Sequence, residues 1–246
     1  METFKANYTK IEKPENTSSE DFKVQEIIEE LRDPLSKIIE QVLEKIKQGK
    51  YGLIIGDDAS GRIPTIILSR FMNKVSNHLN TAKPKVGFFT GSSGLTSKQI
   101  ESKKEAIKES VDKSDVDLGD DNEVLVVTDT VATGASVAPI FQALKEMGVN
   151  TEVATIGIDN GSGVFADTPL KQKANVERIL GVKIYHGQEG TPDVFYKDKG
   201  KLSGVEKNPE DLHAHVYKPE PEMVIAARKY AEELADELFA EFKDRL

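Results

Sequence analysis

The sequence contains no cysteine and no long hydrophobic run. Without cysteine, the chain has no disulfide bonds, no thiolate catalysis and no cysteine-ligated zinc site. No segment approaches the roughly 20 consecutive apolar residues of a membrane-spanning helix. Residues 1–20 are polar and lack the apolar stretch of a signal peptide. We therefore expect a cytoplasmic protein with no membrane partner.

Positive charge is also scarce relative to negative charge. The chain carries 33 lysine and arginine residues against 42 aspartate and glutamate residues, a formal net charge of −9. Because binding to a phosphate backbone requires clustered cationic side chains, this balance disfavours a nucleic-acid-binding surface. With 246 residues, of which 38% are hydrophobic, the chain is long enough to form one elaborated globular α/β domain.

What the sequence does contain is a strand–turn–helix unit whose turn is rich in hydroxyl residues and glycine. Residues 124–127 are consecutive and apolar, the pattern of a strand buried on both faces of a parallel sheet. Asp129 follows at the carboxyl end of this strand, where open α/β sheets bind ligands. The turn at residues 133–136 (Thr-Gly-Ala-Ser) precedes a helical pattern that begins at Val137. Backbone N–H groups at a helix N-terminus, with hydroxyls beside them, suit a phosphate group.

Residues 124–136, which read VLVVTDTVATGAS, resemble the phosphoribosyl-pyrophosphate (PRPP) binding motif of type I phosphoribosyltransferases. The family pattern is an apolar strand, two acidic residues, a short spacer and a Thr-Gly-x-Thr/Ser turn. The resemblance implies that Asp129 faces the ribose hydroxyls and that the turn holds the 5′-phosphate. Thr128 stands where the family usually has its first acidic residue. The residues implied in PRPP binding here are Thr128, Asp129, Thr130, Ala132, Thr133, Gly134, Ala135 and Ser136. An ordinary strand–turn–helix unit without a ligand is the alternative.

A second candidate loop follows an earlier apolar strand. Residues 53–64 read LIIGDDASGRIP and resemble the loop that contacts pyrophosphate in the phosphoribosyltransferases. Arg62 is suited to pair with a phosphate through two hydrogen bonds. We therefore expect a catalytic role for Arg62 together with Asp129. The remaining residues that the resemblance implies in phosphate binding are Ala59, Ser60 and Gly61.

The same loop contains two adjacent carboxylates, Asp57 and Asp58. Two carboxylates repel a pyrophosphate unless a cation lies between them, so we expect Asp57 and Asp58 to bind Mg²⁺ as a cofactor. A solvated acidic turn is the alternative. The glycine spacing also matches a P-loop, but Arg62 and Ile63 replace the lysine and the hydroxyl residue of that motif, which disfavours a nucleoside triphosphatase.

Strand and helix patterns alternate along the chain, which predicts an α/β fold. We expect a parallel sheet with helices on both faces, like that of the type I phosphoribosyltransferases, and a variable C-terminal hood. The expected regions are a polar N-terminal segment (residues 1–20), a phosphoribosyltransferase-like core (residues 21–186), and a hood or lid with the C-terminal helix (residues 187–246).

Residues 91–121 lie where the family carries a flexible loop that closes over the reaction centre. Their Gly/Ser opening and charged helix predict a mobile element. Lys98, Lys103 and Lys104 are interpreted in two ways, as groups that reach pyrophosphate or as solvated helix residues.

Two further features concern the C-terminal region. His213 and His215 are separated by one residue, so on an extended strand their side chains would point the same way. They are interpreted either as metal-binding or catalytic groups or as part of the surface or lid packing. The amphipathic helix at residues 223–242 is expected to pack within the protein or against another subunit, and we expect a homodimer.

Together these features predict a phosphoribosyltransferase that binds PRPP with Mg²⁺ and transfers the phosphoribosyl group to or from a nitrogenous base. Its partners are then small molecules: PRPP and a nucleobase or nucleotide. A regulatory module that binds PRPP or a nucleotide without turnover is the alternative, favoured by Thr128 in place of an acid. No motif identifies the base.

Overall fold

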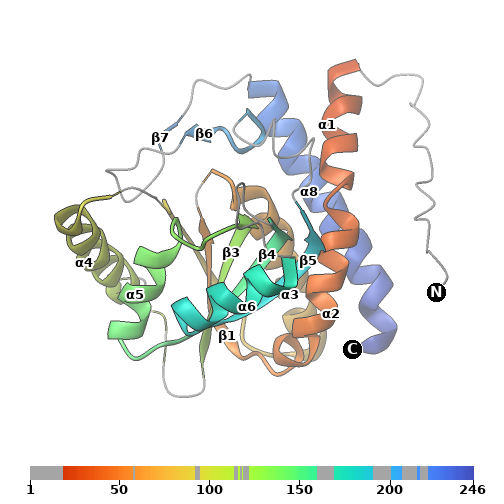
Figure 1. The fold of residues 1–246 in the computed structure, drawn as a ribbon. Coiled ribbons are helices and arrows are strands. Elements are labelled where there is room, and N and C mark those ends of the chain that lie inside the picture. Colours follow the sequence, from red (N-terminus) through yellow and green to blue (C-terminus); the bar gives the residue numbers. More distant parts are fainter. Residues whose placement is uncertain are drawn as a thin grey trace.

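Five parallel strands form one sheet that is covered by helices on both faces (Figure 1). The structure, a computed structural model, describes residues 19–57, 59–91, 95–113, 116, 118, 122–159, 169–190, 201–206, 215–216 and 221–246. The strands of the sheet are β1 (Tyr51–Asp57), β2 (Lys85–Phe89), β3 (Glu123–Val131), β4 (Asn150–Ile158) and β5 (Lys183–Glu189). The α-helices are α1 (Ser19–Glu29), α2 (Arg32–Lys47), α3 (Arg62–Leu79), α4 (Ser97–Lys113), α5 (Ala138–Glu146), α6 (Pro169–Leu180) and α8 (Pro221–Phe242). The predicted fold class is confirmed.

The strand order is β2-β1-β3-β4-β5, so the chain winds outward from the middle in both directions. The adjacent strands β1 and β3 are paired in parallel, with Gly56 opposite Val127. Between them the winding direction reverses. In open α/β sheets this reversal leaves a crevice outside the carboxyl ends of the two strands, and ligands bind there. The topology therefore places the ends of β1 and β3 at the expected ligand position.

The sheet separates two apolar layers. Leu125 and Val127 of β3 pack in the layer formed with α1, α2, α3 and α8. Val124 and Val126 pack in the layer formed with α4, α5 and α6. Successive side chains of a strand point to opposite faces, so the four consecutive apolar residues of β3 fill both layers, as their pattern predicts.

The C-terminal helix α8 packs within the chain, against α3 and α1. Phe242 of α8 meets Phe71 of α3 edge to face, with ring centroids 5.9 Å apart. Polar contacts flank this apolar contact, including an ion pair between Lys74 and Asp236 at 2.9 Å. The predicted helix at residues 223–242 is thus confirmed as part of the core. A homodimer stays a prediction.

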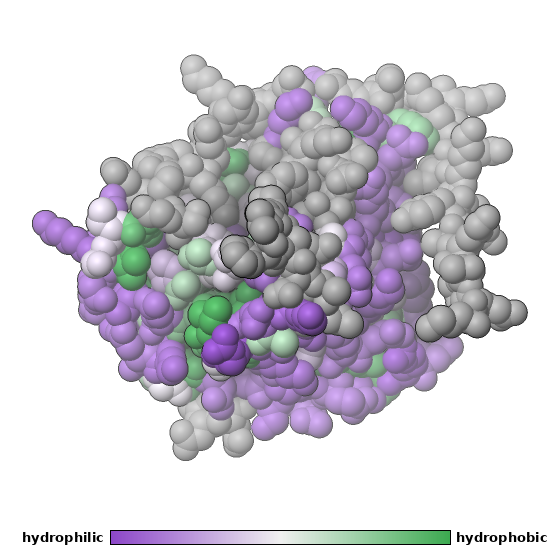
Figure 2. Space-filling model, in the orientation of Figure 1, coloured by the Kyte–Doolittle hydropathy of each residue, from purple (hydrophilic) through white to green (hydrophobic). Residues whose placement is uncertain are grey.

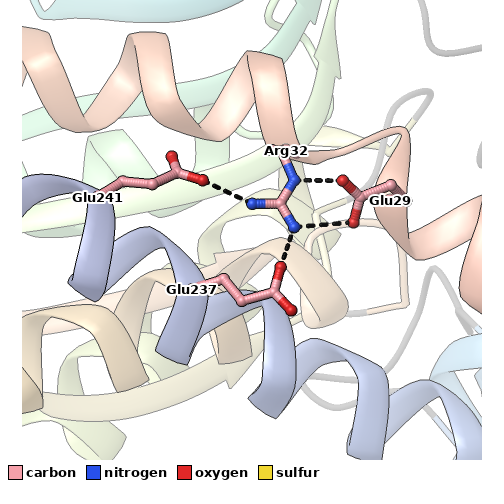
Figure 3. A network of polar contacts seen from close by, with 4 residues as sticks. All are labelled: Glu29, Arg32, Glu237 and Glu241. Carbon is pink, nitrogen blue, oxygen red and sulfur yellow. Dashed lines mark hydrogen bonds and ion pairs between the residues drawn. The ribbon is translucent and has the colours of Figure 1, made fainter. Parts of the chain in front are cut away.

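Arg32 joins the two N-terminal helices to α8 (Figure 3). Its guanidinium contacts the carboxylates of Glu29, at the end of α1, and of Glu237 and Glu241 on α8. The bond to Glu241 is 2.7 Å long. Burial lowers the pKa of Arg32, but the bonds to Glu29 and Glu237 outweigh this effect and the pKa is raised. One cation therefore holds three acidic side chains where α1, α2 and α8 meet.

The helix α4 packs against α5, which was not expected of a mobile element. Ile107 and Val111 of α4 are fully buried in the apolar layer. Lys104 is 6% exposed and forms ion pairs with Glu101 and with Glu146 at the end of α5. Lys103 is equally buried. The interpretation of Lys103 and Lys104 as solvated residues is therefore wrong. The charge of Lys104 is paired with carboxylates of α4 and α5.

The hood is described only in part. A two-residue antiparallel pairing joins β6 (Val205–Glu206) to β7 (His215–Val216), with Glu206 opposite His215. His213 lies outside the described residues, as do residues 191–200. In the part of the chain that the structure describes, no helix has the length and apolar character needed to cross a membrane.

Candidate functional site

Asp57 is the centre of the polar cluster at the end of β1. Its side chain is 2% exposed and accepts hydrogen bonds from three segments of the chain. The N–H of Gly91, just after β2, donates to Oδ1 at 2.8 Å. The hydroxyls of Ser60 and Thr128 each donate to Oδ2 at 3.2 Å. One buried carboxylate thus joins the ends of β1, β2 and β3, and we call these four residues the Asp57 cluster.

The short loop between β1 and α3 packs closely against the sheet. The N–H of Gly61 donates to the carbonyl oxygen of Asp57 at 2.6 Å. A Cβ atom at Gly61 would lie 2.4 Å from the carbonyl oxygen of Val127, so only glycine fits there. Ala59 adopts a φ of 70°, which is strained for a residue with a side chain. A strained backbone at the carboxyl edge of a sheet is common in ligand-binding loops.

Arg62, the first residue of α3, stacks on an aromatic ring. Its Cζ atom lies 4.4 Å from the centroid of the Phe88 ring of β2. The side chain is half-buried. A guanidinium stacked in this way keeps its charge while its orientation is restricted. Arg62 therefore supplies an oriented cation beside the ends of β1 and β2.

The turn after β3 presents free backbone donors at the start of α5. Among the hydrogen bonds of the described residues, the N–H groups of Gly134, Ser136 and Val137 donate to no protein acceptor. Thr133 and Ala135 are exposed, and Ser136 is half-buried. Free N–H groups at a helix N-terminus form a site for an anion. We call residues 133–137 the phosphate turn, after the role that its sequence predicts.

The segment of the phosphate turn is bonded to α6 and lies close to the Asp57 cluster. The carbonyl oxygen of Ala132 accepts a hydrogen bond from the side chain of Gln172 on α6. A Cβ atom at Gly91 would lie 2.7 Å from both Asp57 Oδ1 and the carbonyl oxygen of Ser136, so the turn lies directly beside the Asp57 cluster. The two loops singled out in the sequence are therefore brought together.

Gly134 is required by its backbone conformation and by its close packing against α6. Its φ of +75° favours glycine, and a Cβ atom there would lie 2.8 Å from Val176 Cγ1 on α6. The missing side chain thus makes room for α6. Substitution of Gly134 by a larger residue would disturb the fold, so Gly134 is unsuitable for testing phosphate binding.

The remaining residues of the motif lie along the end of β3. Asp129 is 4% exposed, and the Thr128 hydroxyl lies 3.4 Å from its Oδ1. Thr128, where the family usually has an acid, points to the Asp57 carboxylate. A second acid at this position would face that carboxylate at close range and would be repelled by it. The Thr130 hydroxyl is buried and has no hydrogen-bond partner among the described residues.

The predicted metal-binding residues are Asp57 and Asp58. No group of three or more acidic or histidine side chains with metal-binding geometry occurs in the described part of the chain. Asp57 is buried, and both of its oxygens accept hydrogen bonds from the protein. These bonds give Asp57 a structural role in the described residues, and binding of Mg²⁺ by Asp57 stays a prediction. Asp58 lies outside the described residues.

Sequence reasoning missed the contribution of β2. Gly91 donates to Asp57, and Phe88 supports Arg62, yet neither was singled out as a site residue. One feature of the sequence could have indicated the contribution of β2. Residue 91 opens the Gly/Ser-rich stretch directly after the strand at residues 85–89, and the carboxyl ends of parallel strands meet at one edge of the sheet.

Comparison with protein-family profiles finds no match, and comparison with curated protein sequences finds none either. Among solved structures, an orotate phosphoribosyltransferase from Aeropyrum pernix is similar, with 17% identity, coverage of 66% of this chain and 72% of that chain, and a TM-score of 0.34. A purine phosphoribosyltransferase from Pyrococcus horikoshii Ot3 shows 18% identity and a TM-score of 0.32, and the match covers 54% of this chain and 78% of that chain. A hypoxanthine-guanine phosphoribosyltransferase from Schistosoma mansoni in complex with IMP shows 13% identity, coverage of 57% of each chain, and a TM-score of 0.34. These are weak similarities of fold, and they do not establish a function.

Proposed function

We propose that the protein is a phosphoribosyltransferase that binds PRPP and transfers its phosphoribosyl group to or from a nitrogenous base. The observation that carries this proposal is the phosphate turn. The N–H groups of Gly134, Ser136 and Val137, which donate to no acceptor among the described residues, lie at the topological switch point of a parallel sheet. An oriented set of N–H donors at a helix N-terminus suits the 5′-phosphate of a ribosyl ligand.

The neighbouring residues fit the other parts of PRPP. In the proposed complex Asp129, near the carboxyl end of β3, accepts hydrogen bonds from the ribose hydroxyls. Arg62, held on Phe88, supplies positive charge for the pyrophosphate beside the loop of Ala59, Ser60 and Gly61. A ligand with phosphate at one end, pyrophosphate at the other and a polyhydroxylated ring between them would contact all of these groups.

The reaction would be a displacement at the anomeric carbon. The bond from this carbon to the pyrophosphate oxygen breaks with its electron pair on pyrophosphate, and the carbon forms a new bond to a ring nitrogen of the base. Positive charge develops on the ribose, which the Asp129 carboxylate stabilises, while Arg62 stabilises the departing negative charge. Most of the rate enhancement would come from positioning both reactants. In this proposal Mg²⁺ enters with the pyrophosphate, as part of the substrate complex.

One specific observation favours a different function, binding of PRPP or a nucleotide without turnover. Thr128 replaces the first acid of the family pattern, and its hydroxyl is occupied by Asp57. The ribose would then meet one carboxylate at this position instead of two. A binder of this kind would retain affinity for PRPP and release no pyrophosphate.

Release of pyrophosphate from PRPP and Mg²⁺ in the presence of a panel of nucleobases tests the enzyme directly. Ala135→Glu places a carboxylate in the exposed phosphate turn, and we expect it to abolish turnover and PRPP binding by charge repulsion. Ala174→Glu is the matched control, because Ala174 is also exposed but lies on α6. Wild-type binding of PRPP without turnover on any base would support the binder. Equal PRPP affinity in wild type and Ala135→Glu would refute both functions.

A further inference from the structure

One side of α6 lies against the phosphate turn. Gln172, Val176 and Leu180 are spaced four residues apart, so they share one side of this helix. The side chain of Gln172 donates a hydrogen bond to the carbonyl oxygen of Ala132, the residue before the turn. A Cβ atom at Gly134 would lie 2.8 Å from Val176 Cγ1 and 3.1 Å from Leu180 Cδ1. The helix α6 therefore contacts this segment twice, through one polar and one apolar contact.

The helix α6 is itself fixed to the sheet. Val176 is 1% exposed in the apolar layer between the helix and the strands. Glu177 accepts a hydrogen bond from the N–H of Ile184 on β5 at 2.8 Å. At the end of the helix, the N–H of Gly181 donates to the carbonyl oxygen of Glu177 at 2.8 Å. A side chain of α6 is therefore held on a rigid element, which suits it to orient a neighbouring site.

The bond from Gln172 restricts the peptide unit between Ala132 and Thr133. The described residues contain no cis peptide bond, and in a planar trans peptide the C=O and N–H groups point in opposite directions. Because the Ala132 carbonyl group points to Gln172, the N–H of Thr133 points away from α6. This N–H donates to no acceptor among the described residues. It therefore adds to the backbone donors of the phosphate turn.

The carbonyl groups on both sides of this peptide unit are held by the backbone. The carbonyl oxygen of Val131 accepts a hydrogen bond from the N–H of Asp159 at 3.1 Å. The carbonyl oxygen of Gly134 accepts one from the N–H of Ala138, at the start of α5, at 3.0 Å. Of these three carbonyl groups, that of Ala132 is the one held by a side chain. A substitution at position 172 therefore releases this peptide unit while its neighbours stay bonded.

We propose that Gln172 is a positioning residue for the phosphate turn. Its carboxamide holds the peptide unit between Ala132 and Thr133, so that the Thr133 N–H joins the donors to the ligand phosphate. Donors that are oriented before binding lose little freedom when the anion arrives, and they bind it more tightly for this reason. Gln172 acts through the backbone and touches neither the substrate nor the reacting atoms. This inference rests on the proposed function, because it concerns the site of the 5′-phosphate.

Ribose 5-phosphate is the probe, because it carries this phosphate and has no pyrophosphate. Gln172→Met keeps the length of the side chain and removes the donor, so the affinity measured by calorimetry should fall at least about tenfold. Ala174→Met is the matched control on the same helix and should leave the affinity unchanged, because Ala174 is exposed. Figure 2 shows hydrophilic and hydrophobic side chains together at the surface where Figure 1 draws α6, so this surface accepts a methionine.

Two further measurements separate positioning from a merely structural role. Ribose 5-phosphate should shift the amide signal of Thr133 in the wild type, and this shift should be smaller in Gln172→Met. Gln172→Lys restores a donor near the Ala132 carbonyl oxygen and should bind at least about tenfold more tightly than Gln172→Met. The added charge is tested by Ala174→Lys, which should differ from Ala174→Met by less than about twofold. A structural role alone would lower stability and leave the affinity of the folded variants unchanged.

Three results would overturn the proposal. They are equal affinity in the wild type and Gln172→Met, a Thr133 amide signal that ribose 5-phosphate does not shift in the wild type, and equal affinity in Gln172→Met and Gln172→Lys. Absence of ribose 5-phosphate binding by the wild type would overturn both this proposal and the proposed function. Equal affinity of Gln172→Met and a wild type that does bind would overturn this proposal alone.

Discussion

Replacement of Asp57 by alanine should reveal whether this residue organises the site or binds metal. Its carboxylate accepts hydrogen bonds from Ser60, Gly91 and Thr128 in a setting that is 2% exposed. Each hydrogen bond to a charged group contributes about 1.5–3 kcal/mol. The two hydroxyls can turn toward other acceptors, whereas the Gly91 N–H cannot. We therefore expect Asp57→Ala to lower the free energy of unfolding by about 3–5 kcal/mol.

Asp57→Asn separates the loss of charge from the loss of the acceptor. An amide oxygen can still accept from Gly91, and the amide nitrogen can donate to either hydroxyl, so the expected loss is about 1–2 kcal/mol. Asp112→Ala is the control, because Asp112 is exposed on α4, and its effect should stay within about 0.5 kcal/mol.

The measurement is urea unfolding followed by circular dichroism, in buffer free of divalent cations. Under these conditions a residue that serves only as a metal ligand would contribute no stability. If Asp57→Ala loses less than about 1 kcal/mol, the organising role of the Asp57 cluster is refuted.

Three further predictions concern strain, charge and pH. Ala59→Gly should raise the free energy of unfolding by up to about 1 kcal/mol in the same urea assay, because glycine adopts the φ of 70° without strain; a loss of stability would contradict the strain. Arg32→Gln leaves Glu29, Glu237 and Glu241 without their common cation, so the carboxylates repel one another. The free energy of unfolding should fall by about 1–2 kcal/mol at low salt and by less in 1 M salt, where screening weakens the repulsion. A loss of stability that does not change with salt would contradict the electrostatic role of Arg32. Burial raises the pKa of Glu152, but the bonds from Lys45, Tyr51 and Tyr185 outweigh it and the pKa is lowered in the folded protein. Its ionised form therefore stabilises the protein above the pKa of an unfolded glutamate, and this stability is lost as the pH falls through the lowered value. The stability difference between wild type and Glu152→Gln should therefore shrink from about pH 5 to pH 3, and a constant difference would disprove it.

The main elements of the fold could be predicted from the sequence because their signals are local. Residues 124–127 are buried on both faces of the sheet, as a run of apolar residues indicates. Thr96 and Gln99 stand three residues apart at the start of α4, the spacing of a capping box, and the backbone N–H of Thr96 donates to Gln99 Oε1 at 2.9 Å. In both cases the residues that determine the structure are close together in the chain.

Long-range contacts explain what the sequence could not predict. Asp57 and Asp58 look alike as neighbours in the sequence, and only the fold brings Gly91 and Thr128 to Asp57. The burial of Lys104 likewise depends on Glu146, which lies on another helix. Gly134 is required by contact with Val176 of α6, which no pattern near the turn indicates. The sequence thus indicated the segments that form the candidate site, and the tertiary contacts determine how their residues are held.

The packing of α8 has a consequence for how the protein is made. The apolar layer that covers one face of the sheet extends from Val24 in α1 to Phe242 in α8. During translation, α1, α2 and α3 emerge from the ribosome long before the helix that completes their layer. Until then the side chains of this layer, Phe71 among them, lack their final partners and are open to contact with other hydrophobic surfaces. We expect folding to finish only after synthesis of α8, and chains that end before this helix to be captured by chaperones or to aggregate.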